Sequence, residues 1–415
     1  MTPFTRRGFL TLSGGLVARS ALGLTAPPTE PAPMIDTHDL VRGNTAFALD
    51  LYGRLRSDAG NLFFSPLSIS TALAMTSGGA RGTTLEEMSR VLHLPPSPQT
   101  AFGSLLASVN GTGPADKRAY QLTTANAIWA QKGYPWRPEF TNLIRTDYGA
   151  GLFETNFGRP EEARQAINAW VEKETREKIK DLVPAGEITP LTRMVLTNAI
   201  YFKGSWAAPF KKEKTQDQPF FLADGTTTPV PLMTQTGTFG YGTFTPPTGG
   251  PAQVLEMPYA GKELSMLVLL PATGGLGTLE KDLSPDNLAT WTKDIRPHRV
   301  EVFLPRFKTD KATPLGGPLQ ALGMKAAFND KIADFSGMQT GPELLYITAV
   351  LHKAFVDVNE EGTEAAAATG VVMGARAMHA GQPPVFRADR PFLFLIRENT
   401  SGTILFLGRV TNPKA

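Results

Sequence analysis

The residues that could carry acid–base, nucleophilic or metal chemistry in this chain are few and scattered. Its 415 residues include no cysteine and five histidines, and no two histidines stand at the spacing of metal ligands. Gly204-Ser205-Trp206 is only a fragment of a G-x-S-x-G nucleophile elbow, and no glycine-rich stretch matches a phosphate-binding loop. We therefore expect no enzyme, no metal site and no cofactor. The histidines are His38, His93, His298, His352 and His379.

A different kind of reactivity is suggested by residues 354–376, AFVDVNEEGTEAAAATGVVMGAR. The segment begins with strand-like alternation, turns acidic, passes Gly362 and continues through small side chains to Arg376. One interpretation is an exposed alanine-rich helix that is capped by Thr363. The other is a strand-forming segment whose small side chains fit a crowded sheet. The local pattern alone favours the helix, and sequences elsewhere in the chain are needed to choose between the two interpretations.

Charge and the N-terminus limit the partners and the location. The formal charge is +3, and no run of Lys or Arg exceeds two residues, so we expect no binding to nucleic acid. Thr5-Arg6-Arg7-Gly8-Phe9-Leu10 precedes a weakly apolar stretch and resembles a twin-arginine export signal. That stretch is too short to span a membrane. We predict a signal peptide at 1–26, a Pro-rich linker at 27–35, one domain at 36–415, and export to the periplasm or beyond.

The positions of helices and strands predict the fold class. Helical spacing of apolar residues predicts helices from Asp39 to Leu55 and from Glu161 to Leu182. Ser65-Pro66 and Thr83-Thr84 are helix starts, the second with Glu86 and Glu87 placed for capping boxes. Helices come first and strands mostly later, without β-α-β alternation, which is typical of an α+β domain. Strands are predicted at 120–130, 195–204, 253–257, 264–270, 300–304, 348–358 and 391–410, the last broken by a turn at 399–402.

Short sequences distributed along 36–415 carry a family resemblance. They include Asn61-Leu-Phe-Phe-Ser-Pro-Leu-Ser-Ile, Asn126-Ala-Ile-Trp129, Leu196-Thr-Asn-Ala-Ile-Tyr-Phe-Lys-Gly-Ser-Trp206, Leu304-Pro-Arg-Phe307, Val350-Leu-His-Lys353 and Asp389-Arg-Pro-Phe-Leu-Phe394. In this order and spacing the chain resembles the serpins, a family of metastable protease inhibitors. The resemblance implies three β-sheets, eight or nine helices and an exposed reactive-centre loop, here about 360–385. It also implies that a serine protease cleaves this loop, which then inserts into the main sheet and traps the acyl-enzyme.

The resemblance assigns roles to individual residues. A "shutter" beneath the main sheet corresponds to Ser65, Ser68, Asn198 and His352, although His352 could equally be a satisfied core histidine. Trp206 corresponds to the tryptophan of the "breach", where the loop first enters, although a plain core tryptophan is the alternative. The hinge of the loop comprises Glu360, Glu361, Gly362, Thr363, Glu364, Ala365, Ala366, Ala367, Ala368 and Thr369.

Strand geometry tests the hinge assignment independently. In an inserted strand, alternate residues face opposite sides of the sheet. The face that begins with Thr363 is small and uncharged, which avoids overpacking a core, and Glu364 falls on the other face. This arrangement favours an inhibitor over a non-inhibitory carrier or chaperone-like member that is cleaved as a substrate. The first face comprises Thr363, Ala365, Ala367, Thr369 and Val371.

The residue whose carbonyl is attacked sets the protease specificity. In the family it usually lies 14 residues beyond the hinge glycine, which gives the Arg376–Ala377 bond and a trypsin-like target. A count back from Pro391 gives Ala380 instead, and Ala380 or Met378 would suit elastase-like or chymotrypsin-like enzymes. We favour Arg376, because insertion length is the mechanical constraint. The region 97–120 holds only Lys117 and Arg118 as basic residues, so we expect no heparin site, and we expect a monomer.

Overall fold

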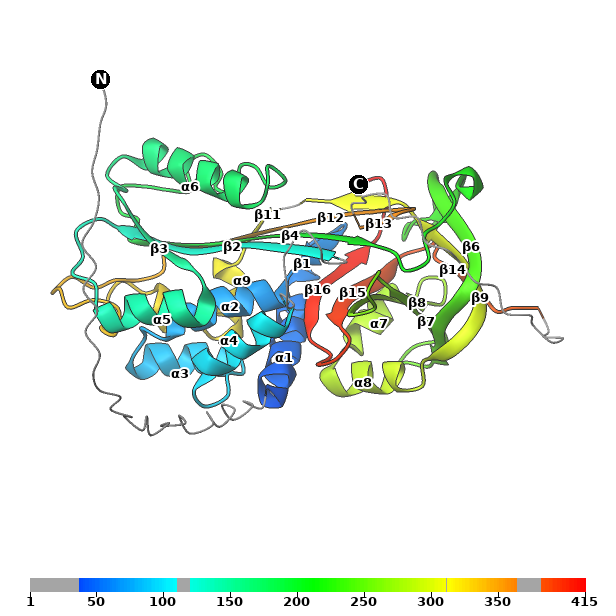
Figure 1. Cartoon of the computed structure of the whole chain (residues 1–415), viewed down its shortest axis with the longest axis horizontal. Helices are drawn as coiled ribbons and strands as arrows, with labels where there is room; N and C mark the ends of the chain where they lie inside the picture. The colour runs from blue at the N-terminus through cyan, green and yellow to red at the C-terminus, as the bar shows by residue number, and fades with distance from the viewer. Residues whose placement is uncertain (1–36, 110–119, 311, 364–381) are drawn as a thin grey trace, which may run out of the picture. The chain divides into compact units, whose positions relative to one another are not determined.

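The computed structural model describes residues 37–109, 120–310, 312–363 and 382–415 (Figure 1). These residues belong to the compact unit Ile35–Ala415, and the predicted signal and linker at 1–35 lie outside them. The α+β prediction is confirmed. The α-helices of the described residues are α1 His38–Leu55, α2 Pro66–Ser77, α3 Gly82–Val91, α4 Pro98–Val109, α5 Pro138–Tyr148, α6 Pro160–Glu174, α7 Leu276–Lys281, α8 Pro285–Lys293 and α9 Gly316–Leu322.

The strands of the described residues form two hydrogen-bonded networks. The first contains β2 Tyr120–Gln131, β3 Gly151–Thr155, β4 Met194–Ser205, β10 Phe307–Thr309, β11 Ala312–Pro314, β12 Ala349–Asn359 and β13 Gly362–Thr363. The second contains β1 Leu62–Phe64, β5 Gln216–Phe221, β6 Thr227–Phe244, β7 Ala252–Pro258, β8 Leu264–Pro271, β9 Arg296–Pro305, β14 Val385–Arg387, β15 Phe392–Glu398 and β16 Ile404–Val410.

The first network is the main sheet, in the order β10-β12-β13-β4-β2-β3. Strands β2 and β4 pair antiparallel from Tyr120↔Gly204 to Ala130↔Met194, along almost the whole length of both strands. Helix α6 lies over one face, and α2 to α5 lie beneath the other (Figure 1). Both faces are therefore covered, which explains why β4 is buried along nearly its whole length.

The second network is divided by its long strand β6. One part of β6 pairs with β5, another with β9, and its last residues pair with β7. Strands β7, β8, β15, β16 and β1 then continue as one antiparallel set. This division gives three strand sets in all, in agreement with the three sheets that were expected.

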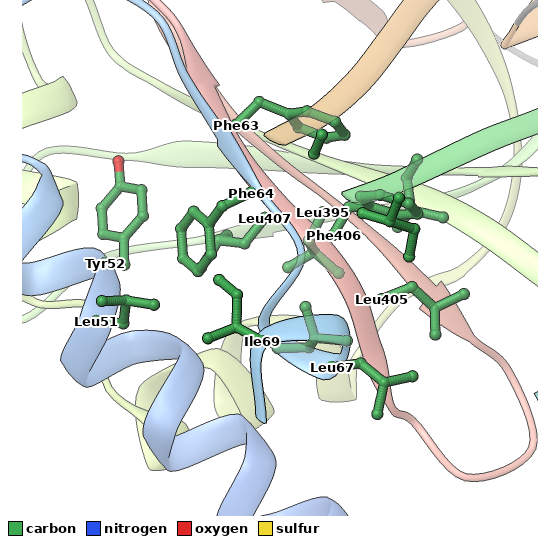
Figure 2. Close-up of a cluster of buried hydrophobic side chains, with 14 of the residues drawn as sticks. Leu51, Tyr52, Phe63, Phe64, Leu67, Ile69, Leu395, Leu405, Phe406 and Leu407 are labelled. Atoms are coloured by element: carbon green, nitrogen blue, oxygen red, sulfur yellow. The ribbon is translucent and has the colours of Figure 1, made fainter. Parts of the chain in front are cut away.

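An apolar cluster joins the helices to the second network. Phe63 of β1 stacks between Phe394 of β15 and Phe406 of β16, with ring centroids 5.6 and 5.2 Å apart. Figure 2 shows Leu51 and Tyr52 of α1 facing Phe64 and the adjacent side chains of α2 and β16. Burial of so many aromatic and aliphatic side chains is the main stabilising term of the domain.

Two predicted helix boundaries are wrong. The helix predicted to run from Glu161 to Leu182 ends at Glu174, because Arg176 and Glu177 have φ of 53° and 61°. Ile179 and Leu182 still pack in the same apolar cluster as α6, because Asn168 holds the following backbone through two hydrogen bonds to Val183. The predicted apolar residues therefore do pack together, but Ile179 and Leu182 belong to a loop and not to the helix.

The helix predicted to start at Thr83-Thr84 begins at Gly82, with Arg81 as its N-cap. Glu87 does not complete a capping box there, because its carboxylate accepts the backbone N–H groups of Lys325 and Ala326, at 2.7 and 2.6 Å. By contrast, Ser65 caps α2 as predicted, since its side chain accepts the N–H of Ser68.

Membrane-spanning helices and metal-ligand clusters are both absent from the described residues. Of the residues that the structure describes, none forms a helix long and apolar enough to cross a membrane. Nor do the described His, Asp and Glu residues come together in threes as a metal site would require.

Candidate functional site

The start of the predicted hinge lies within the main sheet. Strand β13 is inserted between the ends of β12 and β4 and is antiparallel to both. Below it, β12 and β4 pair directly and in parallel. At one end of the sheet, β13 therefore separates β12 from β4 over two residues, and further along the two strands pair directly. The registers are Gly362 with Ser205 and Asn359, and Thr363 with Gly204 and Val358.

Gly362 allows this entry because the backbone of β4 lies too close for any side chain at this position. Its φ is 150°, and a Cβ added there would lie 2.1 Å from the carbonyl oxygen of Gly204 and 2.6 Å from Cα of Ser205. Any larger residue would push β13 away from β4. The hinge glycine is thus required by close backbone approach, as well as by its dihedral angle.

Thr363 is fully buried, and its hydroxyl lies 2.9 Å from the hydroxyl of Tyr259. Burial raises the pKa of Tyr259 well above its usual value, so the phenol remains a neutral hydrogen-bonding group. Thr363 is therefore a buried strand residue, and the helix that it would cap in the alternative interpretation lies outside the described residues.

Trp206 closes the entrance on the β4 side. Its ring stacks on Tyr259 with centroids 4.7 Å apart, and its indole N–H donates to the carbonyl of Asn359 at 2.9 Å. Its backbone N–H donates to the carbonyl of Glu361 at 2.8 Å. The predicted breach residue therefore contacts the chain immediately before β13, and it is more than a plain core tryptophan.

Two ion pairs fix the acidic residues that precede β13. Glu360 is buried and accepts hydrogen bonds from the Arg306 guanidinium at 2.5–2.9 Å and from the Thr215 hydroxyl at 2.5 Å. Burial raises the pKa of Glu360, but these hydrogen bonds outweigh it and leave the pKa below its usual value. Glu361 pairs with Lys212 at the surface, at 2.5 Å. Together they anchor the chain segment that immediately precedes β13.

The predicted shutter residues form one connected network. His352 and Asn198 are opposite each other on β12 and β4, and the His352 ring Nδ1 is hydrogen-bonded to Asn198 Oδ1. The backbone N–H of Ser65 donates to His352 Nε2 at 3.0 Å. The Asn198 amide donates to Ser68 Oγ at 2.6 Å and to Asn126 Oδ1 at 2.5 Å. A strand entering between β12 and β4 has to separate His352 from Asn198.

The hydrogen bonds determine the tautomer of His352. Because Nε2 accepts from a backbone N–H, the ring proton lies on Nδ1, and the ring is neutral. Burial lowers the pKa of His352 to about 3, and the interaction with Asn198 offsets this only in part. The shutter is therefore a neutral network at physiological pH.

Acidification should lower the free energy of unfolding of the protein through His352. Its folded pKa lies below the ordinary 6.5, so the contribution of neutral His352 is complete above pH 6.5 and is lost as pH falls toward 3. At pH 5 the loss should be about 2 kcal/mol in the free energy of unfolding. Denaturant unfolding at pH 7.5 and 5 tests this, with His352→Gln as the comparison. An equal pH dependence in both proteins would contradict the assignment.

Sequence reasoning did not assign a role to three members of the site. Asn126 and Arg306 stood within the recognised sequences, but nothing local marked these two residues or Tyr259 as partners of the hinge or shutter. Their partners are 58, 104 and 54 residues away along the chain, respectively. The remaining predicted site residues lie outside the described residues. These are Glu364–Thr369, the bond Arg376–Ala377 and its alternatives Met378 and Ala380.

Comparison with known proteins places this geometry in a family. The family model "Serpin (serine protease inhibitor)" matches residues 42–413. A serpin-like protein of Thermococcus kodakarensis is 42% identical over 90% of this chain and 86% of its own length. Bovine leukocyte elastase inhibitor is 43% identical over 90% of this chain and 99% of its own. A crystal structure of human thyroxine-binding globulin with thyroxine has a TM-score of 0.82 and 33% identity, covering 91% of this chain and 99% of that one.

Proposed function

The chain belongs to the serpin family of serine protease inhibitors, and from this premise we propose that it traps trypsin-like serine proteases as a suicide substrate. The protease attacks the carbonyl carbon of Arg376, the peptide bond to Ala377 breaks, and the protonated amine of Ala377 becomes the N-terminus of a C-terminal fragment that still carries β14, β15 and β16. The remaining acyl-enzyme ester links the protease to the reactive-centre loop. Insertion of that loop between β12 and β4 then carries the protease away before water hydrolyses the ester.

Strand β13 is the observation that carries this proposal. It already occupies the position of a new central strand, antiparallel to both neighbours. Insertion therefore needs no new entry point and only extends an existing ladder downward. Each further residue of the loop would pair one residue further back along β4 and along β12.

The extended register supports the predicted insertion length. Thr363 pairs with Gly204, so residue 373 would pair with Met194, where β4 begins. Ten residues, 364–373, would then complete the strand along β4. Arg376 would follow three residues later, whereas Ala380 would follow seven residues later. A shorter tether holds the acylated protease closer to the end of the sheet, which favours Arg376.

The extended register also gives the two faces of the inserted strand. Thr363 lies on the core face, with Tyr259, so odd-numbered residues of the loop would follow it inward. Thr369 would arrive between Asn198 and His352, the pair whose hydrogen bond insertion breaks. Its hydroxyl can accept from His352 Nδ1–H and donate to Asn198 Oδ1, so one threonine would replace the lost bond.

Incubation with trypsin tests the proposal directly. We expect a covalent complex that survives SDS and boiling, and release of a peptide that starts at Ala377, identified by mass spectrometry. Arg376→Ala should abolish the complex with trypsin, because the protease pocket loses its cationic partner. Arg299→Ala, at an exposed position on β9, is the matched control and should form the complex normally.

A parallel incubation with elastase tests which peptide bond of the loop is cleaved. The bovine relative is named as a leukocyte elastase inhibitor, which is the reason to include this enzyme. Complexes with elastase alone, with a released peptide starting after Met378 or Ala380, would overturn the trypsin-like specificity and retain the mechanism.

The alternative is a non-inhibitory serpin that acts as a carrier or in a chaperone-like role. The structural likeness to thyroxine-binding globulin is the observation in its favour. Clean cleavage by both proteases, without any covalent complex, would select this alternative.

We further propose that the protein acts as a monomer, without a polyanion or metal cofactor. Arg6-Arg7 and the following apolar stretch would direct export of the folded protein to the periplasm or beyond. Retention of the protein inside the cell after Arg6→Lys and Arg7→Lys would support this export signal.

A further inference from the structure

A cavity of about 460 Å³ lies at the end of the main sheet where β2 ends and β4 begins. Four loops form its walls: the turn after β2, the turn before α6, the segment before β4 and the segment that leads toward β12. Its volume falls within the range of small-molecule binding sites, roughly 300–1,000 Å³. Its polar side chains come from Gln131, Lys132, Tyr134, Asn156, Arg193 and Glu343.

Hydrogen bonds between the loops hold these walls in place. The backbone N–H of Gln131 donates to the carbonyl of Arg193 at 2.9 Å, and the N–H of Thr340 donates to the carbonyl of Pro135 at 3.0 Å. The N–H of Phe157, in the turn before α6, donates to Gln131 Oε1 at 2.9 Å. Each of these bonds joins two different walls. The cavity is therefore formed without a ligand, as most small-molecule sites are.

Arg193 supplies a cation that has no anionic partner in the described part of the chain. Its Nη1 donates to the backbone carbonyls of Pro190 and Thr192, at 3.2 and 3.0 Å, and no described carboxylate forms an ion pair with it. The Nε and Nη2 groups keep the planar edge that binds a carboxylate through two parallel hydrogen bonds. Lys132 is a second cation of the lining, and it too pairs with no carboxylate among the described residues.

Glu343 supplies the opposite charge on another wall of the cavity. Its Oε2 accepts from the Tyr134 hydroxyl at 3.3 Å, and no Lys or Arg that the structure describes forms an ion pair with it. Burial and the charge of Glu343 raise the pKa of Tyr134, while the charge of Arg193 lowers it in part, so both charges act on this phenol. A guanidinium and a carboxylate thus line one cavity without neutralising each other.

This arrangement complements a ligand that carries both charges. An ammonium group would pair with Glu343, a carboxylate would pair with Arg193, and a second carboxylate would balance Lys132. We propose that the cavity binds a small zwitterion with an excess of negative charge, namely an acidic amino acid, either free or at the N-terminus of a short peptide. The binding does not depend on the proposed inhibitory function, because no residue of the reactive-centre loop takes part in it.

Titration calorimetry of the full chain at pH 7 tests the site, with L-glutamate as probe. Glutarate lacks the ammonium group and L-glutamine lacks the second carboxylate. We expect saturable one-site binding of L-glutamate and about tenfold weaker binding of each of the other two, since each loses one charge-assisted contact. In a parallel titration, tighter binding of L-glutamyl-L-glutamate than of L-glutamate would assign the site to peptide N-termini, and the reverse would assign it to the free amino acid.

Two variants test the assigned contacts separately. Glu343→Gln should bind L-glutamate no better than glutarate, because the partner of the ammonium group is lost. Arg193→Gln should weaken the binding of both by about tenfold or more, because the partner of the carboxylate is lost. Glu213→Gln and Arg299→Gln, the same changes at exposed positions elsewhere, are the matched controls and should bind normally.

Glu343 is exposed and glutamine has nearly its shape, so Glu343→Gln should fold. Its melting temperature without ligand, compared with that of the parent, checks this. Equal binding of L-glutamate and glutarate by the parent would overturn the site, as would a preference for L-glutamate that survives in Glu343→Gln. Absence of binding by L-glutamate and by L-glutamyl-L-glutamate would overturn it as well. A covalent complex with trypsin would still form in that case, so failure of the site and failure of the inhibitory function are distinguishable.

Discussion

Thr363→Arg should convert the protein from an inhibitor into a substrate of trypsin. The variant should be cleaved after Arg376 at the normal rate, but almost all of the acyl-enzyme should hydrolyse. The reason is that Thr363 is fully buried in β13, where it packs beside Val358, Gly204 and Tyr259. Of these three described neighbours, none carries a carboxylate that could pair with a guanidinium.

The size of the effect follows from kinetic competition between insertion and hydrolysis of the ester. Burying an unpaired charge costs several kcal/mol. A rise of about 3 kcal/mol in the barrier to insertion slows it roughly 100-fold. Complex yield should then fall from most of the protein to a few per cent, measured by SDS gel densitometry at a fixed ratio of inhibitor to protease.

Gln382→Arg is the matched control for added charge. It introduces the same side chain at an exposed position after the scissile bond, in a part of the loop that does not insert. Its complex yield should match that of the unmodified protein. Unchanged yield in Thr363→Arg as well would eliminate insertion through β13 as the trapping step.

Much of the fold could be predicted because short-range signals specify it. Ser65-Pro66 supplies a capping hydroxyl and a ring already fixed at helical φ, and α2 begins there. The end of α6 was not predictable in this way. Arg176 and Glu177 adopt positive φ without being Gly or Asn, and they do so because Ile179 and Leu182 must reach the same apolar cluster. Tertiary packing overrides local propensity at that point.

The site was predictable in its residue types and less so in its partners. The small side chains after Gly362 indicated a segment that can enter a sheet, and Thr363 is found inside one. The pairing of Glu360 with Arg306 was not foreseen, because a carboxylate and a guanidinium 54 residues apart carry no local signal. Asn126 likewise stood in a recognised sequence without an assigned role, yet its Oδ1 accepts hydrogen bonds from the Asn198 amide and from Ser68 Oγ.

Cleavage of the reactive-centre loop by a protease that is then removed should raise the melting temperature of the protein by about 10–20 °C. The uncleaved sheet is closed by direct pairing of β12 with β4 over seven residues, Ala349–Phe355. Inserting 364–373 replaces these hydrogen bonds with two ladders, for a net gain on the order of ten hydrogen bonds at about 1 kcal/mol each. For a domain of this length, each kcal/mol moves the melting temperature by roughly 1–2 °C. Differential scanning calorimetry of both forms measures the difference.

Thr369→Val separates this stabilisation from a mere release of strain. If Thr369 arrives between Asn198 and His352, the cleaved variant leaves the His352 ring proton and the Asn198 oxygen without a partner inside the core. Each unsatisfied group costs about 1–3 kcal/mol, so the cleaved variant should melt several degrees below the cleaved parent. The uncleaved variant should melt with its parent, because His352 and Asn198 are then bonded to each other. A deficit that appears equally in both forms would place Thr369 elsewhere and refute the extended register.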